Sequence, residues 1–371
     1  MAFCEFKNVR IAGVAAGVPK KIISNLTLSA EKGEISTEYT PEQFIELTGV
    51  KERRISDCLT TSDLGFAAAE RLIADLKWNK AEIEAVIFVS QTADYILPCT
   101  ACILQDRLGL SKECYAADVT LGCSGWVYGL SYVCGLLGSG TIRKALLIVG
   151  DAKKRVDNDV SIRDPLFGHA GTATAVEYAE GADGFKFHFG TDGSGYDAII
   201  TPDGGSRNPV NPKTSFEFYE EDGKRYHRMM THMKGMDVFS FGITTAPKSV
   251  KKLAEHFGFD YLTYDWFLFH QANMKMNNMI VKKLKLDPTK VPSEMYNFGN
   301  TSSASIPLLF VTQIRDKVNG VKQKFVCCGF GVGLSWGTVA FEDAIHVSEL
   351  VEVDDSAENY GYKLPSKRKE V

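Results

Sequence analysis

Two stretches of the chain repeat the same order of elements, and this duplication limits what the sequence can fold into. Residues 66–92 read as a helix, a loop and an apolar strand, and residues 250–273 repeat that order. In each copy a sharp turn of small residues then opens another helix, at Cys123 in the first and at Asn300 in the second. One such unit cannot bury its sheet alone, so we expect the copies to pack about a pseudo-twofold axis. Cys123 and Asn300 would then be counterparts, with His270 beside them.

Apolar segments rich in β-branched residues alternate with helical patterns along the chain. Because these strands are apolar along their whole length, we expect sheets that are covered by helices on both faces. The predicted fold class is α/β, with five αβαβα layers formed by two pseudo-twofold-related halves. The expected strands are 8–14, 85–91, 145–150, 171–178, 266–270 and 324–329, and the expected helices are 62–76, 98–108, 124–138, 236–257, 273–286 and 303–318.

The chain divides into two halves and a tail. We place the N-terminal half at residues 1–182 and the C-terminal half at residues 183–344, because turn residues cluster in EGADG at 180–184. Residues 201–230 are rich in Gly, Asn, Pro and charge, and we expect a surface excursion there. Residues 345–371 are polar and charged and cannot bury enough surface to fold alone. This tail would be either disordered or an arm on a partner subunit.

Composition excludes several functions. A net charge of −4 in 371 residues leaves no electrostatic footprint for nucleic acid as the main ligand. Nine scattered cysteines in a chain of this size indicate a reducing, cytoplasmic compartment rather than a disulfide framework, and the N-terminus has no secretory signal pattern. Residues 119–142 carry no charge, but their six glycines favour a buried helix over a membrane span. We therefore expect no membrane span.

Cys123 stands where a strand would end and a helix would begin. Gly122 permits a tight turn before it, and Ser124 and Gly125 follow. At a helix N-terminus, the dipole and the unpaired N–H groups would lower the pKa of a thiol and expose it to substrate. The alternative is a buried apolar cysteine, as we expect for the other cysteines, including the Cys99-Thr-Ala-Cys102 pair. The small residues around Cys123 favour a nucleophile.

The second copy supplies two polar residues and a glycine-rich segment. His270 ends an apolar strand, and Asn300 lies in a turn made by Gly299. A core histidine and a turn asparagine would give the same pattern, and only the duplication links both residues to Cys123. The segment GFGVGLSWG at 329–337 lacks the helix and acidic residue that complete a nucleotide site, so an oxyanion-hole loop is the better interpretation.

Several motifs together resemble the β-ketoacyl-acyl carrier protein synthase III family of the thiolase superfamily. They are the Cys123 turn, TGVKERR at 48–54, RDPLFGHAGTA at 163–173, MKGMDVFSF at 233–241, HQAN at 270–273, GNTSSASIP at 299–307 and GFGVGLSWG at 329–337. The resemblance covers residues 8–342 and implies a thiolase-like fold. It also implies an acyltransferase that loads an acyl group from a thioester onto Cys123 and condenses it with malonyl-ACP.

The resemblance assigns roles to individual residues. His270 and Asn300 would stabilise the enolate oxygen that forms when a malonyl thioester loses CO2, because a neutral imidazole and an amide can both donate to it. The backbone N–H groups of Cys123 and Val332 would form an oxyanion hole, although the family commonly has glycine where Val332 stands. The family's phosphopantetheine and carrier contacts map onto Arg163, Gly235, Phe239, Asn273 and Lys275.

The same resemblance implies an acyl carrier protein as partner and a homodimer, in which Leu97 gates the acyl pocket of the other subunit. No metal or cofactor is expected besides the phosphopantetheine of ACP or CoA that carries the substrates. Gln43 and Leu47 stand where the family commonly has the tryptophan and arginine that hold the CoA adenine, and residues 26–40 form a longer segment than usual. The sequence thus leaves open the acyl donor, the acyl group, and whether the pathway makes fatty acids or a specialised product such as a polyketide.

Three alternatives remain at this stage. The order Cys, His, Asn, with 147 positions from Cys123 to His270, also occurs in papain-like proteases, but the repeated α/β unit argues against them. A second alternative keeps the fold and moves the acyl group to an alcohol or amine without loss of CO2. The third is a non-catalytic interaction protein, and the intact Cys123, His270 and Asn300 argue against it.

Overall fold

The computed structural model describes residues 2–28, 39–152, 165–221 and 224–355, and these contain two mixed β-sheets. The first sheet comprises β2 (Val9–Pro19), β5 (Ala85–Val89), β6 (Tyr115–Val119), β7 (Lys144–Asp151), β8 (Ala170–Tyr178), β17 (His346–Val347) and β18 (Val351–Val353). The second sheet comprises β1 (Ala2–Phe6), β9 (Phe185–Thr191), β14 (Trp266–Phe269), β15 (Lys322–Gly331) and β16 (Ser335–Ala344).

Helices cover both faces of the two sheets. The long ones are α2 (Thr61–Leu76), α3 (Thr100–Arg107), α4 (Gly125–Leu137), α5 (Gly235–Phe257) and α6 (Met274–Leu284). A further helical segment consists of α8 (Ser305–Leu309), a π-helical turn (Phe310–Ile314) and α9 (Arg315–Val318). The smaller elements are α1 (Pro41–Thr48), α7 (Met295–Phe298) and the strand pairs β3 (Ile22–Ser24) with β4 (Glu52–Arg54), β10 (Ile199–Ile200) with β13 (His232–Met233), and β11 (Tyr219–Glu221) with β12 (Lys224–Tyr226).

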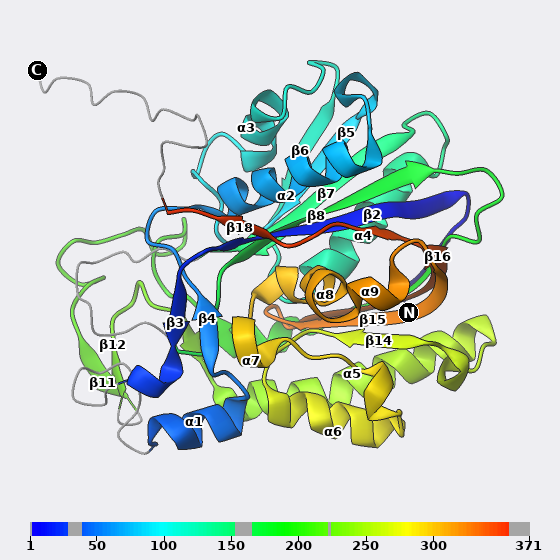
Figure 1. The fold of residues 1–371 in the computed structure, drawn as a ribbon. Helices are drawn as coiled ribbons and strands as arrows, with labels where there is room; N and C mark the ends of the chain where they lie inside the picture. Colours follow the sequence, from blue (N-terminus) through cyan, green and yellow to red (C-terminus); the bar gives the residue numbers. More distant parts are fainter. Residues whose placement is uncertain (1, 29–38, 153–164, 222–223, 356–371) are drawn as a thin grey trace, which may run out of the picture.

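The layers follow the predicted αβαβα order. Helices α2 and α3 lie on the outer face of the first sheet, α4 and α8 lie between the sheets, and α5 and α6 cover the outer face of the second (Figure 1). The predicted fold class is therefore confirmed. The excursion at residues 201–230 carries β11 and β12 beside the layered body (Figure 1).

The two sheets repeat one topology, as the duplication requires. In the first sheet β2, β8, β7 and β5 are neighbours in that order, and in the second β9, β16, β15 and β14 take the same places. In both sets the first three strands pair antiparallel and the last pair is parallel. The carboxyl ends of β5, β7, β14 and β15 therefore come to equivalent positions, and the turns that carry Cys123 and Asn300 lie there.

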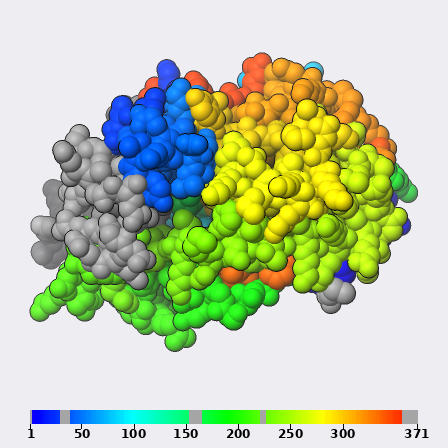
Figure 2. All heavy atoms as spheres, turned by 90° about the horizontal axis from the view of Figure 1, so that it is seen from below, coloured from blue at the N-terminus to red at the C-terminus, as the bar shows by residue number. Residues whose placement is uncertain are grey.

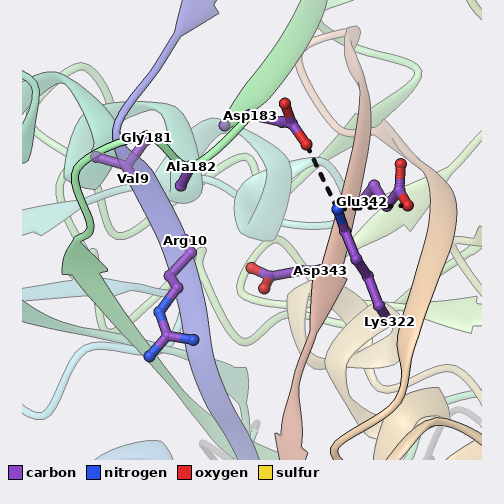
Figure 3. A pocket seen from close by; sticks show the side chains of 9 residues that line it. Val9, Arg10, Gly181, Ala182, Asp183, Lys322, Glu342 and Asp343 are labelled. Carbon is purple, nitrogen blue, oxygen red and sulfur yellow. Dashed lines mark ion pairs between the residues drawn. The ribbon is translucent and has the colours of Figure 1, made fainter.

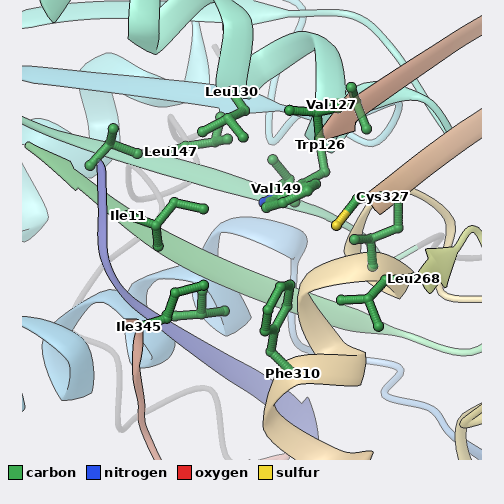
Figure 4. Packing of buried hydrophobic residues seen from close by; sticks show 14 of the residues in the cluster. Ile11, Trp126, Val127, Leu130, Leu147, Val149, Leu268, Phe310, Cys327 and Ile345 are labelled. Atoms are coloured by element: carbon green, nitrogen blue, oxygen red, sulfur yellow. The ribbon is translucent and has the colours of Figure 1, made fainter. Parts of the chain in front are cut away.

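The central helical layer forms the largest apolar core. In α4, Trp126, Val127 and Leu130 are buried, and they pack with Leu147 of β7 and Phe310 of the π-helical turn (Figure 4). The uncharged run at 119–142 is thus a strand end, a turn and a buried helix, as predicted. No helix within the described ranges is both long and apolar enough to cross a membrane.

The two ends of the chain cross between the halves. β1 pairs with β9 in the second sheet, whereas β17 and β18 pair in parallel with β2 in the first. The prediction of an unfolded tail or partner arm beyond residue 344 is therefore wrong for residues 346–353. Val347 and Val353 are fully buried at the edge of the first sheet. Burial of these apolar side chains offsets the entropy lost when the short segment becomes ordered. Residues 356–371 lie outside the described residues.

Candidate active site

Glycines shape the turn that presents Cys123. The turn joins β6 to α4 and is closed by a hydrogen bond from the Gly125 N–H to the Gly122 carbonyl, at 2.6 Å. A Cβ at Gly122 would lie 2.1 Å from Gln91 Oε1, and a Cβ at Gly331 would lie 2.6 Å from Cys123 Cβ and 2.9 Å from its Sγ. Carbon atoms normally approach only to about 3.5 Å, so a side chain at Gly331 would displace Cys123, whereas one at Gly122 would require the exposed Gln91 side chain to move aside.

Ser302 lies at the centre of the predicted site. Its Oγ is 4.0 Å from Cys123 Sγ, and its backbone N–H donates to Asn300 Oδ1 at 2.9 Å. Ser305 Oγ donates to the Ser302 carbonyl at 2.8 Å and is also 2.8 Å from His270 Nδ1. The structure thus brings the three side chains predicted from distant parts of the sequence around one buried serine.

Asn300 is held by both halves of the chain. Its N–H donates to the Leu166 carbonyl at 2.9 Å, and its own carbonyl accepts from the Gly168 N–H at 3.1 Å. Because a peptide N–H can only donate, the side-chain atom that meets the Ser302 N–H is the amide oxygen. The amide nitrogen has no hydrogen-bond acceptor within the described part of the chain. Asn300 Nδ2 is consequently a positioned donor whose acceptor is not among the described residues.

His270 is buried and neutral. It directly follows β14, its N–H donates to the Cys328 carbonyl at 2.9 Å, and its ring meets the Phe330 ring edge to face, with centroids 5.6 Å apart. Burial lowers the pKa of the imidazole to about 3. One of the two ring nitrogens therefore carries the only ring proton near neutral pH. The Ser305 hydroxyl beside Nδ1 has one proton of its own, so its orientation sets which nitrogen that is.

The predicted low pKa of the Cys123 thiol is wrong. Cys123 as a residue is partly accessible, but its thiol is densely surrounded by protein, and this burial raises its pKa to about 12, with a further increase from the Asp151 carboxylate. Hydrogen bonds from Ser302 and from the N–H groups of Cys123 and Val332 act in the opposite direction and do not compensate. The sequence position was favourable, but the tertiary surroundings outweigh the helix N-terminus.

Sequence reasoning missed Ser302, Ser305 and Asp151. The serines lie within the GNTSSASIP motif, but no pattern indicates which hydroxyl faces which partner. Asp151 ends β7, and its Oδ1 accepts from Ser90 Oγ at 3.0 Å and from the Gln91 N–H at 2.8 Å. Only the sheet order, with β7 beside β5, indicates that this carboxylate lies near the nucleophile.

Comparisons with known proteins agree with this geometry. The family model described as 3-oxoacyl-[acyl-carrier-protein (ACP)] synthase III matches residues 117–193, and the model of its C-terminal part matches residues 255–342. A β-ketoacyl-[acyl-carrier-protein] synthase III from Chlamydia caviae is 33% identical over 346 residues, which is 91% of this chain and 98% of that protein. The chain belongs to the synthase III family.

Two further relatives agree with this membership. The synthase III from Desulfitobacterium hafniense is 30% identical and aligns with 89% of this chain and 96% of its own length. The crystal structure of a 3-oxoacyl-(acyl-carrier protein) synthase from Burkholderia xenovorans superposes with a TM-score of 0.84 at 34% identity, covering 95% of this chain and 99% of that one. As a synthase III family member, the protein is an acyl-transferring enzyme, and the protease and non-catalytic alternatives are set aside.

The residues assigned to carrier binding in this synthase III member lie on α5 and α6. Gly235 is the exposed first residue of α5, and Phe239 is half-buried one turn later. Asn273 is the N-cap of α6, where its Oδ1 accepts from the Met276 N–H at 2.8 Å, and Lys275 is exposed in the first turn. The α5 and α6 side chains make up much of the face seen in Figure 2. Arg163 lies outside the described residues.

Leu97, Gln43 and Leu47 are near the surface. Leu97 is 83% exposed and its neighbour Ile96 is 95% exposed, so this loop projects two large apolar side chains into solvent. Gln43 closes a capping box at the start of α1, where its Oε1 accepts from the Thr40 N–H at 2.9 Å. Its side chain is therefore engaged in holding α1.

A polar hollow lies at the opposite end of β15 from the nucleophile. It has a volume of about 140 Å³, and Lys322 at its mouth pairs with Asp183 and Glu342 at 3.7 and 3.6 Å (Figure 3). Lys322 begins β15 and Gly331 ends it, which separates the hollow from Cys123 by about 30 Å at 3.3 Å per residue. This hollow is not part of the site. In the same described ranges, no group of three or more His, Cys, Asp or Glu side chains gathers as a metal site.

Proposed function

We propose that the protein makes a β-ketoacyl thioester in two steps. An acyl group passes from a thioester to Cys123, and the acylated cysteine then condenses with malonyl-ACP as CO2 is lost. The observation that carries this proposal is the convergence of Cys123, His270 and Asn300 on Ser302. The names of the relatives favour condensation over transfer to an alcohol or amine.

In the first step the Cys123 sulfur attacks the thioester carbonyl. A new S–C bond forms, the original S–C bond breaks, and the thiol proton leaves with the departing carrier thiol. The N–H groups of Cys123 and Val332 both point to the sulfur, so a carbonyl bound there would receive two donors as its oxygen becomes negative. Because burial raises the pKa of the Cys123 thiol to about 12, we expect the proton to leave during the attack on bound substrate rather than before binding.

In the second step two donors stabilise the enolate. Loss of CO2 leaves a pair of electrons that would delocalise onto the thioester oxygen of the malonyl group, and the resulting carbanion attacks the acyl-cysteine. Asn300 Nδ2, which has no acceptor among the described residues, is one donor. His270 can be the other through Nε2 once the Ser305 hydroxyl turns from the Ser302 carbonyl and donates its proton to Nδ1, which leaves the ring proton on Nε2. A neutral imidazole suits this role, since the step needs a donor rather than a strong base.

The surface of α5 and α6 supports an acidic carrier protein as the substrate-delivering partner. Lys275 and Lys283 are exposed on α6, and Lys248 and Lys251 are exposed on α5. Three of these lysines line a hollow of about 480 Å³ between the two helices. The exposed pair Ile96 and Leu97 supports a homodimer in which this loop is covered by the second subunit.

All nine cysteines are free thiols, which supports the cytoplasmic location that we propose. The phosphopantetheine of the carriers supplies the thioesters, and neither proposed step uses another cofactor.

The test combines intact-mass spectrometry with CO2 release. We expect a panel of acyl-ACP and acyl-CoA thioesters to leave an adduct on Cys123, and addition of malonyl-ACP to release CO2 and a 3-oxoacyl product. Asn300→Ala should still form the adduct but release CO2 about 100-fold more slowly or worse, as expected for the loss of one oxyanion donor. Asn297→Ala, an exposed change three residues away, is the matched control.

Two results would contradict the proposal. Transfer of the acyl group to an alcohol or amine without CO2 release would support the non-decarboxylating acyltransferase instead. Equal rates of CO2 release from Asn300→Ala and Asn297→Ala would show that the amide is not used.

A further inference from the structure

Two thiols outside the active site lie against each other at the start of α3. Cys99 is the N-cap of this helix and Cys102 is its third residue, and their sulfur atoms are 3.2 Å apart. Cys99 is half-buried and Cys102 is exposed. Neither step of the proposed reaction uses them.

The place of this pair in the fold is typical of redox-active cysteines. Helix α3 connects β5 to β6, which are parallel neighbours in the first sheet, so the pair opens the helix of a strand-helix-strand unit. Two cysteines separated by two residues in that position are the usual arrangement of a reversible dithiol. The sequence alone gave no reason to prefer this interpretation over two buried apolar side chains.

The backbone around the pair is already held in place. Asp118 of β6 accepts hydrogen bonds from the Thr100 N–H and the Ala101 N–H, each at 2.7 Å, so the first turn of α3 does not depend on the thiols. A disulfide has an S–S distance of about 2.05 Å, so each sulfur would move by only about 0.6 Å. Side chains three residues apart share one face of a helix, which is why this short movement suffices.

We propose that Cys99 and Cys102 are a redox-modification site that closes to an intramolecular disulfide with a low-molecular-weight disulfide as oxidant. The thiolate of one cysteine attacks the oxidant, which forms a mixed disulfide and releases one small thiol. The second cysteine then attacks the mixed disulfide and releases the other. The two protein thiols lose two protons and two electrons, and the oxidant is reduced to two thiols.

The site lies next to the loop that we assign to the subunit interface. Leu97 precedes Cys99 by two residues, and it is 83% exposed in the single chain. Closing the disulfide would tie Cys99, where this loop ends, to the first turn of α3. That consequence rests on the proposed function, whereas formation of the disulfide does not.

The experiment follows the two cysteines by mass. The full-length protein is incubated under native conditions with oxidised glutathione, free thiols are blocked with iodoacetamide, and peptides are mapped. We expect the peptide with Cys99 and Cys102 to lose about 2 Da and escape alkylation, and dithiothreitol to restore it. Cys102→Ser should trap a glutathione adduct on Cys99. Cys58→Ser, which removes another exposed thiol, should leave the result unchanged.

Two outcomes would overturn the proposal. In one, the folded wild-type protein carries separate glutathione adducts on Cys99 and Cys102. In the other, both residues are alkylated in full after exposure to the oxidant, with unchanged circular dichroism. Since the readout is the mass of one peptide, it stands apart from the test of condensation.

Discussion

Replacing Gly331 with alanine would test whether the position of the nucleophile limits the reaction. Gly331 ends β15 and lies against Cys123, where an added Cβ would approach Cys123 Cβ to 2.6 Å and Sγ to 2.9 Å. Comfortable contact requires about 3.5 Å or more, so the two residues must separate by about 1 Å. Gly331 is not among the residues with a left-handed backbone, so the contact alone is tested.

The expected effect on catalysis is large. A displacement of about 1 Å at a reacting atom costs about 100-fold in rate, which corresponds to about 2.7 kcal/mol of activation free energy. The added methyl group would also lower the free energy of unfolding by about 1–3 kcal/mol. The assay is single-turnover acylation of Cys123, followed by quenched intact-mass measurements well below the melting temperature.

Gly135→Ala is the control for this experiment. Gly135 lies within α4, the helix that follows the Cys123 turn, and a Cβ there would meet only Phe6 Cε1 at an ordinary 3.9 Å. This change should leave acylation unaffected and raise the free energy of unfolding by about 0.5–1 kcal/mol, because alanine is the better helix former. A folded Gly331→Ala protein that acylates within about threefold of wild type, a difference below 1 kcal/mol, would refute the reasoning.

Three further changes have defined outcomes. Asp151→Asn removes a carboxylate that raises the pKa of Cys123, so the pH profile of iodoacetamide alkylation should shift to lower pH. An unshifted profile would show that the Asp151 charge does not raise the pKa of the Cys123 thiol. Ser305→Ala removes the hydroxyl beside His270 Nδ1, so CO2 release should fall about tenfold or more while acylation persists, and 15N NMR should report a change of the His270 tautomer. Glu294 is buried, both its carboxylate oxygens lack partners in the described ranges, and burial raises its pKa well above 4.5. The folded state then holds a proton that the unfolded chain releases, so stability is lost as pH rises above 4.5. Denaturant unfolding should show that the free energy of unfolding of Glu294→Gln, relative to wild type, is about 1–3 kcal/mol higher at pH 8 than at pH 5. An equal difference from wild type at both pH values would contradict this account.

The long apolar elements could be predicted from the sequence because their burial is continuous. The strand expected at 145–150 extends over β7 (Lys144–Asp151), and the helix expected at 124–138 is α4 (Gly125–Leu137). β9 was not predicted because Phe185 and Phe187 alternate with polar residues, and such a short alternating run gives a weak signal. The π-helical turn at 310–314 was likewise hidden inside a helical pattern.

Only the site residues that lie in recognisable sequence motifs could be predicted from the sequence. Cys123 follows β6, His270 follows β14, and Asn300 lies in the turn after α7 that corresponds to the Cys123 turn in the duplicated unit, so topology brings them together. The positions of Ser302 and Asp151 depend on side-chain directions and on neighbouring strands, which no local pattern encodes. For the same reason the pKa of Cys123 could not be predicted from its position at a helix start, since burial by distant segments decides it.

The exchange of terminal strands means that the duplicated halves are not separable modules. A chain cut between β8 and β9 would leave the second sheet without β1 and the first without β17 and β18. Each fragment would expose a bare strand edge along β9 or β2, and such edges recruit other chains. Pairing of each terminal strand with the other half's sheet therefore makes the closure of these edges internal to one polypeptide.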